Sequence, residues 1–170
     1  MNDKKRSTEI EKYTSDCLTM MKDAHIVLPE KASVNIYHHC GADKLGQVGA
    51  MFINVVNRDY CKNIVVMTAG QSYPNHYHRI KTESFYVLYG ELIVVIDGAE
   101  HTVRPGELLH IERGCDHSFR TVNGTVFEEI STMYVPNDSV YTDEEIAKTS
   151  YSGRRTSISP EQWKEIKDNA

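Results

Sequence analysis

The sequence has no apolar run long enough to cross a bilayer, no signal-peptide core and no excess of positive charge. Its longest apolar run of interest, Leu92–Ile96, is far shorter than the roughly 20 residues that a membrane-spanning helix needs. The first nine residues are mainly charged or polar, unlike the apolar core of a signal peptide. A net charge of −5 argues against nucleic acid and anionic membranes as partners. We therefore expect a cytoplasmic protein.

The cysteines do not form a recognisable metal or disulfide motif, because no two of them are arranged as Cys-x-x-Cys. Scattered thiols of this kind are typical of reduced, partly buried side chains in a cytoplasmic protein. The four are Cys17, Cys40, Cys61 and Cys115.

The length of 170 residues predicts one domain with a full core. Apolar residues recur at three- and four-residue spacing over residues 7–24, which predicts a helix that Ser7 or Thr8 would cap. A second, short helix is expected after Ser159, the cap, with Pro160 at the first helical position and Gln162 closing a capping box.

Between the two helices the pattern changes to short strands with glycine-containing turns, which is typical of a sandwich or closed barrel. The dipeptides Asp97-Gly98 and Asn123-Gly124 predict two-residue hairpins. We expect an all-β fold divided into a helical or extended arm (1–45), a barrel (46–147) and a linker with a C-terminal helix (148–170), the linker covering 149–158. The predicted strands are 33–38, 49–55, 62–68, 84–89, 91–97, 100–103, 107–112, 117–121 and 125–134.

The segment from Gly70 to Gly90 contains most of the candidate metal ligands. His76 and His78 lie at i and i+2, so on a strand their side chains point to the same face. Glu83 follows five residues after His78, and His117 lies further along the chain. Three imidazoles and one carboxylate suit Zn, Mn, Fe, Co or Ni and leave coordination positions open for water or substrate. A cation would also offset the cost of burying the Glu83 carboxylate at the start of an apolar strand.

This segment resembles the first motif of the cupin superfamily, G-x5-HxH-x4-E-x6-G, at every specified position. The second cupin motif matches at Gly106, Gly114 and His117 and departs from it at Glu112 and Thr121, neither of which is a ligand position. The resemblance implies a single jelly-roll-type cupin β-barrel that holds one divalent metal ion, with Mn or Zn expected first. His76, His78, Glu83 and His117 would be its ligands.

Two flanking segments, residues 57–67 and 128–143, make the chain resemble the D-lyxose isomerase family of cupins. The likeness extends over roughly residues 50–146, and the loops between motifs are shorter here. The closing segment is also similar to that of cupin domains linked to nonulosonate synthesis. The D-lyxose isomerase resemblance implies a metal-dependent isomerase that interconverts a small aldose and ketose, such as D-lyxose and D-xylulose, through a metal-bound enediol.

Such an isomerisation needs an electrophile and one or two proton carriers. Lys81 lies two residues before Glu83 and can lean toward the same pocket. Glu128 and Glu129 point to opposite faces of a strand, so one of them faces inward. The resemblance selects Glu129 as the base, with Lys81 as the acid or as the group that stabilises the enediolate. A solvated lysine and a salt-bridged strand glutamate are the structural alternatives.

Four further residues are candidates for binding the sugar. Lys62, Asp138 and Asp143 would hold hydroxyl groups, although Asp143 also fits a helix N-cap. Phe119 shares its face with His117 and would stack on the sugar, unless it is plain core. An outward Tyr86 and Leu88 pair would suit a homodimer interface.

A cupin metal site does not by itself fix a function. A carbohydrate-binding or sensor protein without turnover is one alternative, and a non-haem iron dioxygenase is another. A phosphoglucose isomerase is less attractive, because the pocket region offers few basic residues for a phosphate.

Overall fold

The computed structural model describes residues 3–169. Helices α1 (Asp3–Asp23), α2 (Glu144–Lys148) and α3 (Pro160–Asp168) accompany a 3₁₀ turn at Ala42–Lys44. The strands are β1 (Ser33–Tyr37), β2 (Ala50–Asn57), β3 (Tyr60–Met67), β4 (Ser72–His78), β5 (Glu83–Gly90), β6 (Leu92–Ile96), β7 (Ala99–Val103), β8 (Leu108–Ile111), β9 (His117–Arg120), β10 (Thr125–Thr132), β11 (Ser139–Tyr141) and β12 (Arg155–Ile158).

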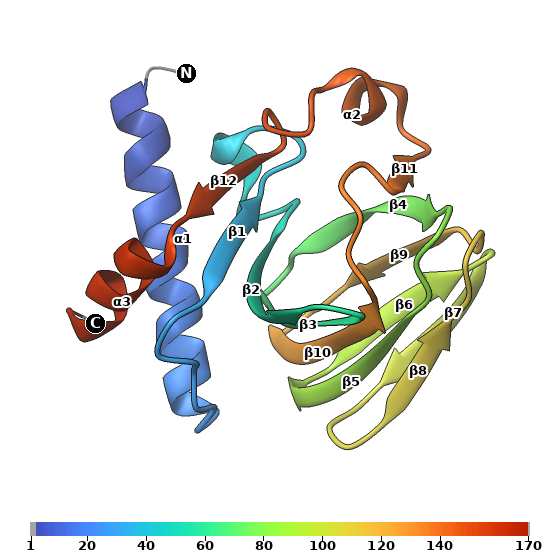
Figure 1. Cartoon of the computed structure of the whole chain (residues 1–170), viewed down its shortest axis with the longest axis horizontal. Helices are drawn as coiled ribbons and strands as arrows, with labels where there is room; N and C mark the ends of the chain where they lie inside the picture. The colour runs from blue at the N-terminus through green and yellow to red at the C-terminus, as the bar shows by residue number, and fades with distance from the viewer. Residues whose placement is uncertain (1–2, 170) are drawn as a thin grey trace.

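The strands form two sheets that pack face to face (Figure 1). One has seven strands in the order β12-β1-β2-β3-β10-β5-β8, and the other has five in the order β11-β4-β9-β6-β7. The predicted all-β jelly-roll-type fold with an N-terminal helix and a short C-terminal helix is confirmed. The two sheets are not joined into one hydrogen-bonded cylinder, so the barrel is built as a sandwich of two open sheets.

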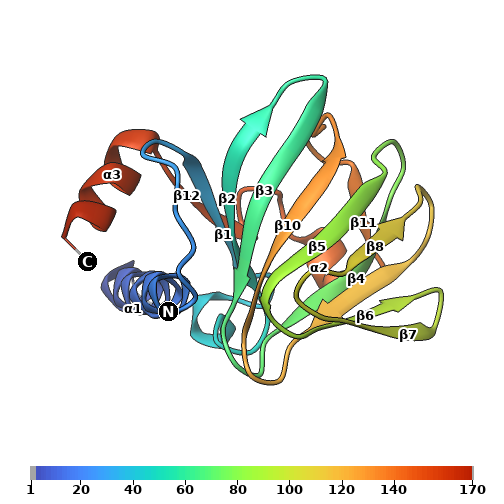
Figure 2. The same ribbon diagram turned by 90° about the horizontal axis from the view of Figure 1, so that it is seen from below.

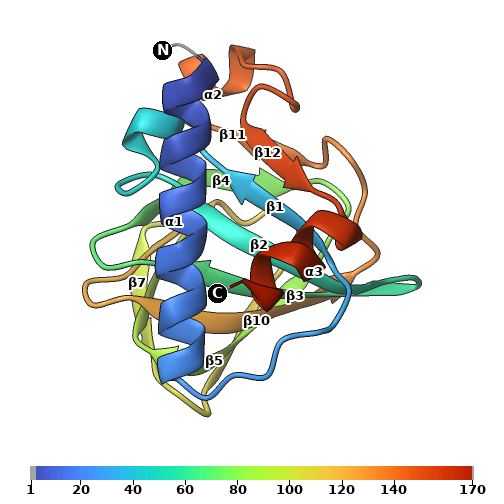
Figure 3. The same cartoon turned by 90° about the vertical axis from the view of Figure 1, so that its left-hand side faces the viewer.

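Two apolar cores explain this layering. Side chains alternate along β5, so Phe85 and Val87 are fully buried between the sheets, where Phe85 meets Phe119 of the five-stranded sheet at a ring distance of 5.3 Å. The opposite face of the seven-stranded sheet packs under α1 and α3 (Figures 2 and 3). Cys17 of α1 and Trp163 of α3 are fully buried there.

The helix predictions are correct in kind and wrong at one boundary. Helix α1 begins at Asp3, before the Ser7 or Thr8 cap that we expected. Helix α3 has the predicted capping box between Ser159 and Gln162. Among residues 3–169, no helix combines the length and the apolar character that crossing a bilayer requires.

One of the two predicted hairpins exists. Asp97-Gly98 joins the paired strands β6 and β7, and both of its residues have positive φ. Asn123-Gly124 instead connects β9 of one sheet to β10 of the other, so the hairpin prediction is wrong there. Gly124 has φ of 92°, and a Cβ on it would lie 2.9 Å from the Met20 sulfur. A glycine at this position therefore allows both the backbone conformation that crosses between the sheets and the close packing of α1.

The predicted linker at 149–158 is also wrong in part, because its last four residues form β12. This strand pairs antiparallel with β1, and Val34 lies opposite Ile158. The segment is polar and so does not resemble a strand in sequence. It becomes a strand only by pairing with β1, more than a hundred residues earlier in the chain. Strand β1 precedes the range 46–147 in the sequence and β12 follows it, yet both belong to one edge of the seven-stranded sheet. The division into three segments stays a prediction.

The expected dimer face is partly covered by the chain itself. Tyr86 and Leu88 do point away from the inner core, but Leu88 packs against the cluster beneath α1. A homodimer stays a prediction.

Candidate metal centre

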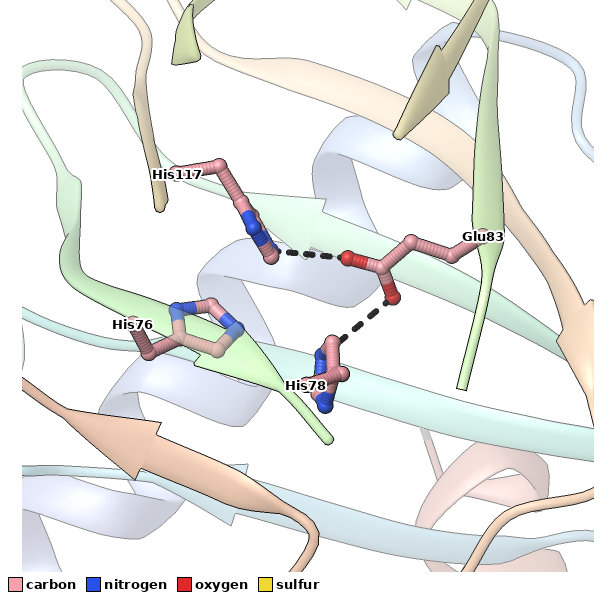
Figure 4. A group of neighbouring side chains, drawn as sticks. All are labelled: His76, His78, Glu83 and His117. Atoms are coloured by element: carbon pink, nitrogen blue, oxygen red, sulfur yellow. Dashed lines mark ion pairs between the residues drawn. The ribbon is translucent and has the colours of Figure 1, made fainter. Parts of the chain in front are cut away.

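Three strands bring the predicted ligands together between the sheets. His76 and His78 come from β4, and His117 lies directly opposite His76 on the neighbouring β9. Glu83 enters from the facing sheet at the start of β5. Figure 4 shows the four side chains pointing toward one another.

The four side chains form a compact, buried cluster. One ligand atom from each residue lies within 4.8 Å of all the others. The Glu83 carboxylate is 2.8 Å from His117 Nε2 and 3.5 Å from His78 Nε2. Ligand atoms about 2.1 Å from a metal lie roughly 3 to 4 Å from one another, so a group within 4.8 Å needs only small side-chain movements to close around an ion.

The outer nitrogen of each histidine is held so that Nε2 faces the cluster. His76 Nδ1 is 2.9 Å from the Pro74 carbonyl, and His117 Nδ1 is 3.0 Å from the Cys115 carbonyl. His78 Nδ1 is 3.4 Å from the Asp138 carboxylate. A ring that donates from Nδ1 keeps the Nε2 lone pair free for a metal, which is the arrangement found around most metal-bound histidines.

The electrostatics favour deprotonated ligands. Burial lowers the pKa of His76 well below its usual value, and it lowers the pKa of His78 to about 4, with the Lys81 cation adding to the effect. Burial alone would raise the pKa of Glu83, but Lys81 and His117 hold it well below the usual range. His117 is the exception, because the Glu83 carboxylate 2.8 Å from its Nε2 outweighs burial and raises its pKa.

These residues fit a divalent transition metal. His78 Nε2 and His117 Nε2 are buried without a hydrogen-bond partner of good geometry among the described residues. Buried polar atoms are rarely left in this state, and a cation among them would satisfy both. Nitrogen and carboxylate donors together suit Mn, Fe, Co, Ni or Zn, and the identity of the metal stays a prediction.

Lys81 links this cluster to the predicted base. Its Nζ lies 2.6 Å from Glu83 and 3.0 Å from Glu129, and all three side chains are nearly inaccessible to solvent. Burial alone would lower the pKa of Lys81, but the two carboxylates raise it above its usual value. Burial raises the pKa of Glu129, although Lys81 opposes this. The solvated-lysine alternative is therefore wrong.

Strand parity separates the two adjacent glutamates. Glu129 is 6% exposed and points inward. Glu128 points to the other face of β10, where it pairs with Lys62 at 2.6 Å.

A cavity of about 230 Å³ adjoins the cluster. Its walls carry ligand, charged, amide and aromatic side chains from both sheets and from the loop before β11. They include His76, His78, Glu83, Lys81, Glu129, Asn35, Asn54, Asn57, Asn63, Tyr73, Phe119, Tyr134 and Asp138.

The structure does not bring all the predicted sugar-binding residues to this cavity. Lys62 is held on the outer face by Glu128. Asp143 caps α2 by accepting hydrogen bonds from the backbone of Glu145 and Ile146, as its structural alternative predicted. Phe119 does line the cavity, stacked on Tyr73 at 4.6 Å.

Asp138 lines the cavity, but its carboxylate is engaged by the turn that follows β4. It accepts hydrogen bonds from the backbone N–H groups of Arg79, Ile80 and Lys81 at 2.9 to 3.1 Å. With its contact to His78, this places Asp138 as a positioning residue for the ligand and for Lys81.

The sequence analysis missed Asn63, which donates a hydrogen bond of 3.1 Å to Glu129 Oε1. Asn54 in turn donates to Asn63 at 2.9 Å. The available signal was parity, because an asparagine next to the apolar run of β3 shares its face with Cys61 and so points to the interior.

The comparisons with known proteins agree with this architecture. Residues 63–129 match the family model of the cupin domain. Over 51 residues the chain is 39% identical to a quercetin 2,3-dioxygenase of Bacillus subtilis (strain 168), a match that covers 30% of this chain and 15% of that protein. The chain thus spans only a small part of that curated relative.

Solved structures of L-ribose isomerases are similar over most of the chain. The enzyme of Cellulomonas parahominis has a TM-score of 0.65 at 14% identity, covering 83% of this chain and 94% of that one. The enzyme of Geodermatophilus obscurus has a TM-score of 0.66 at 13% identity, covering 82% and 93%. The Acinetobacter sp. DL28 enzyme in complex with L-ribose has a TM-score of 0.66 at 14% identity, covering 83% and 94%.

At these identities the structural likeness establishes a shared fold. Residues 63–129 therefore carry a segment that matches the cupin domain, within a fold that resembles that of the L-ribose isomerases.

Proposed function

We propose that the protein is a metal-dependent aldose–ketose isomerase acting on a small sugar. The observation that carries the proposal is the buried ion-pair chain Glu83–Lys81–Glu129, which joins a candidate metal ligand to a candidate base on the wall of one cavity. A protein that only binds sugar has no need for such a chain, because burying three charges is costly without a function or a counter-ion.

The metal would be held by His76, His78, Glu83 and His117. When bound, it supplies a Lewis acid for the oxygen atoms at C1 and C2 of the sugar.

Glu129 is placed to carry the proton between C1 and C2. Lys81 and Asn63 both donate to its Oε1, and no described residue donates a hydrogen bond to Oε2. Oε2 is therefore free to take the proton from C2 of the aldose, which leaves an enediolate, and to return it to C1 as the ketose forms, while the Lys81 ammonium passes the hydroxyl proton from O2 to O1.

Lys81 is placed to stabilise the charge that develops on the substrate. An ammonium has three N–H donors, and two of them are directed to Glu83 and Glu129. The third can donate to the enediolate oxygen inside the cavity, where a low dielectric strengthens the interaction.

The cavity wall suits a polyol. The amide oxygens of Asn35 and Asn57 and the amide N–H groups of Asn54 are engaged within the protein. The N–H groups of Asn35 and Asn57 and the oxygen of Asn54 can therefore serve hydroxyl groups, and Phe119 and Tyr73 offer apolar rings. We expect D-lyxose and D-xylulose to be turned over, and the fold shared with L-ribose isomerases adds L-ribose to the candidates.

The test is proton NMR in D₂O with protein loaded separately with Mn, Zn and Co. D-Lyxose, D-xylulose, L-ribose, D-mannose and D-fructose are each incubated, and manganese is chelated before detection. Loss of the C2 proton signal together with appearance of the isomer supports the proposal. No exchange and no product with any metal or sugar overturns it and favours a carbohydrate-binding protein without turnover, which sugar calorimetry would then test.

One observation favours a second candidate, a non-haem iron dioxygenase. The chain is 39% identical over 51 residues to a quercetin 2,3-dioxygenase, and three histidines with one glutamate also suit iron. Oxygen uptake by the Fe(II)-loaded protein in the presence of quercetin would support this candidate. The asparagine-lined wall near the cluster favours the isomerase.

A further inference from the structure

Arg154 is a buried cation without a counter-ion. Only 9% of the residue is exposed, and its guanidinium carbon lies 4.7 Å above the centre of the Tyr141 ring. Within residues 3–169, no carboxylate lies within ion-pair distance of the guanidinium and no hydrogen bond from it is present. Charged groups are almost never buried in this way unless they pair with another group.

Arg154 lies on the wall of a small second cavity of about 30 Å³, lined mainly by tyrosines. This volume exceeds what one water molecule needs. The Tyr134 hydroxyl, also on this wall, is buried without a hydrogen-bond partner among the described residues. Tyr151, on the same wall, accepts a hydrogen bond from Arg155. An unpaired cation and an unpaired hydroxyl therefore share one small space.

The small cavity adjoins the cavity at the metal cluster. Tyr37, Tyr73, Tyr134, Val135 and Ser139 line both.

The Tyr141 ring contacts both His76 and Arg154, so it limits the distance between the metal cluster and the guanidinium. The ring stacks on His76 with 5.4 Å between centroids, while Arg154 lies 4.7 Å from the same ring. The guanidinium carbon can therefore lie no further from the His76 ring than the sum of these distances. A five- or six-carbon sugar with a charged end group can bridge such a span.

The charges of the larger cavity are already compensated. Lys81 neutralises part of the charge on Glu83 and Glu129, a metal would take the rest, and Asp138 is occupied by three backbone N–H groups. Among the described residues that line these two cavities, Arg154 is the charged side chain without a counter-ion.

We propose that Arg154 and Tyr134 bind the terminal anionic group, a carboxylate or a phosphate, of a sugar whose other end lies at the metal cluster. Guanidinium groups recognise both anions through paired, charge-assisted hydrogen bonds. The inference rests on the proposed function only in taking the ligand to be a sugar. It makes sugar acids or sugar phosphates the preferred class over neutral sugars.

The test is calorimetric binding with the zinc-loaded full chain at fixed salt, because binding does not depend on turnover. The probes are D-glucose, D-glucuronate and D-glucose 6-phosphate, with D-ribose and D-ribose 5-phosphate as a shorter pair. We expect at least one anionic sugar to bind about 10- to 100-fold more tightly than its neutral counterpart. The glucuronate and phosphate arms separate the two kinds of anion.

Arg154→Gln should remove this preference and leave the affinity for neutral sugars unchanged. Arg120→Gln is the matched control, since Arg120 is half-exposed and pairs with Glu100 on the surface. Tyr134→Phe should weaken anion binding about 3- to 10-fold and gives a second variant if Arg154→Gln does not fold. An anionic sugar that merely ligates the zinc would bind native protein and Arg154→Gln equally.

Equal affinity for neutral and anionic sugars in the native protein would overturn the inference, as would a preference that survives both substitutions. The result is independent of the isomerase test. An Arg154-dependent preference without turnover would support this site while refuting the isomerase, and turnover without the preference would do the reverse.

Discussion

Replacing Glu129 with glutamine tests the proposed base directly. The amide oxygen of glutamine can accept the hydrogen bonds that Lys81 and Asn63 now donate to Glu129 Oε1. Lys81 keeps Glu83 as its charged partner at 2.6 Å, so no buried cation is left unpaired. We expect a stability loss of about 1 kcal/mol, the difference between charged and neutral acceptors, which lowers Tm by roughly 2–4 °C in a chain of this size.

The effect on turnover should be much larger. A positioned general base contributes about 10²- to 10⁴-fold to the rate, which corresponds to about 2.7–5.5 kcal/mol of activation free energy. Because glutamine cannot take the proton from C2, kcat should fall by this factor. Metal content should stay at the native level, since Glu129 is not a ligand and Lys81 is still held by Glu83.

The assay measures isomer formation and C2-proton exchange together with metal content by elemental analysis. Glu128→Gln is the matched control. It makes the same chemical change one residue away, on the outer face where Glu128 pairs with Lys62, and should change kcat by less than twofold. If Glu129→Gln turns over within threefold of the native rate while holding its metal, the assignment of the base is wrong.

Three further predictions follow from the same geometry. His78→Ala should lose bound zinc and turnover together, and excess zinc should then raise Tm less than it raises that of the native protein. Asp138→Asn should weaken zinc about 10- to 100-fold in a chelator competition, because an amide cannot accept all three backbone hydrogen bonds. Asp143→Asn, which still caps α2, should not weaken zinc. Burial beside Arg154 lowers the pKa of His39 to about 3, so unfolding protonates His39 below its usual value near 6.5. Its contribution to stability is complete above pH 6.5 and falls by about 2 kcal/mol at pH 5. Urea unfolding of His39→Gln should show a correspondingly smaller loss between these pH values, and an equal loss would contradict the reasoning.

The sequence alone was sufficient for the residues that local geometry controls. The i, i+2 spacing of His76 and His78 and the parity of Phe119 with His117 depend only on strand alternation, and both hold in the structure. The capping box at Ser159 and the hairpin at Asp97-Gly98 are likewise short-range features with one favourable backbone solution.

Predictions failed where a distant partner decides the outcome. Residues 155–158 become a strand because β1 offers an unpaired edge, and Asn123-Gly124 crosses between sheets because β9 and β10 pair with other strands. Lys62 is a different case, because its parity is opposite to that of Cys61 and Asn63 on β3, so it faces outward and pairs with Glu128. Composition and spacing do not show which strands pair with one another, which is why the predictions at residues 155–158 and 123–124 failed.

Asp138 shows how such long-range contacts build the proposed site. The sequence suggested a sugar ligand, yet its carboxylate fastens the turn at 79–81 to the loop before β11. That one turn separates His78 from Lys81, which connects the candidate ligand Glu83 to Glu129. The same loop supplies Tyr134, which lines the second cavity together with Arg154 and whose hydroxyl has no hydrogen-bond partner among the described residues. Residues 134–138 therefore position both ends of the proposed substrate, so changes in this loop should alter metal affinity and anion preference together, whereas changes in the β6–β7 hairpin should alter neither.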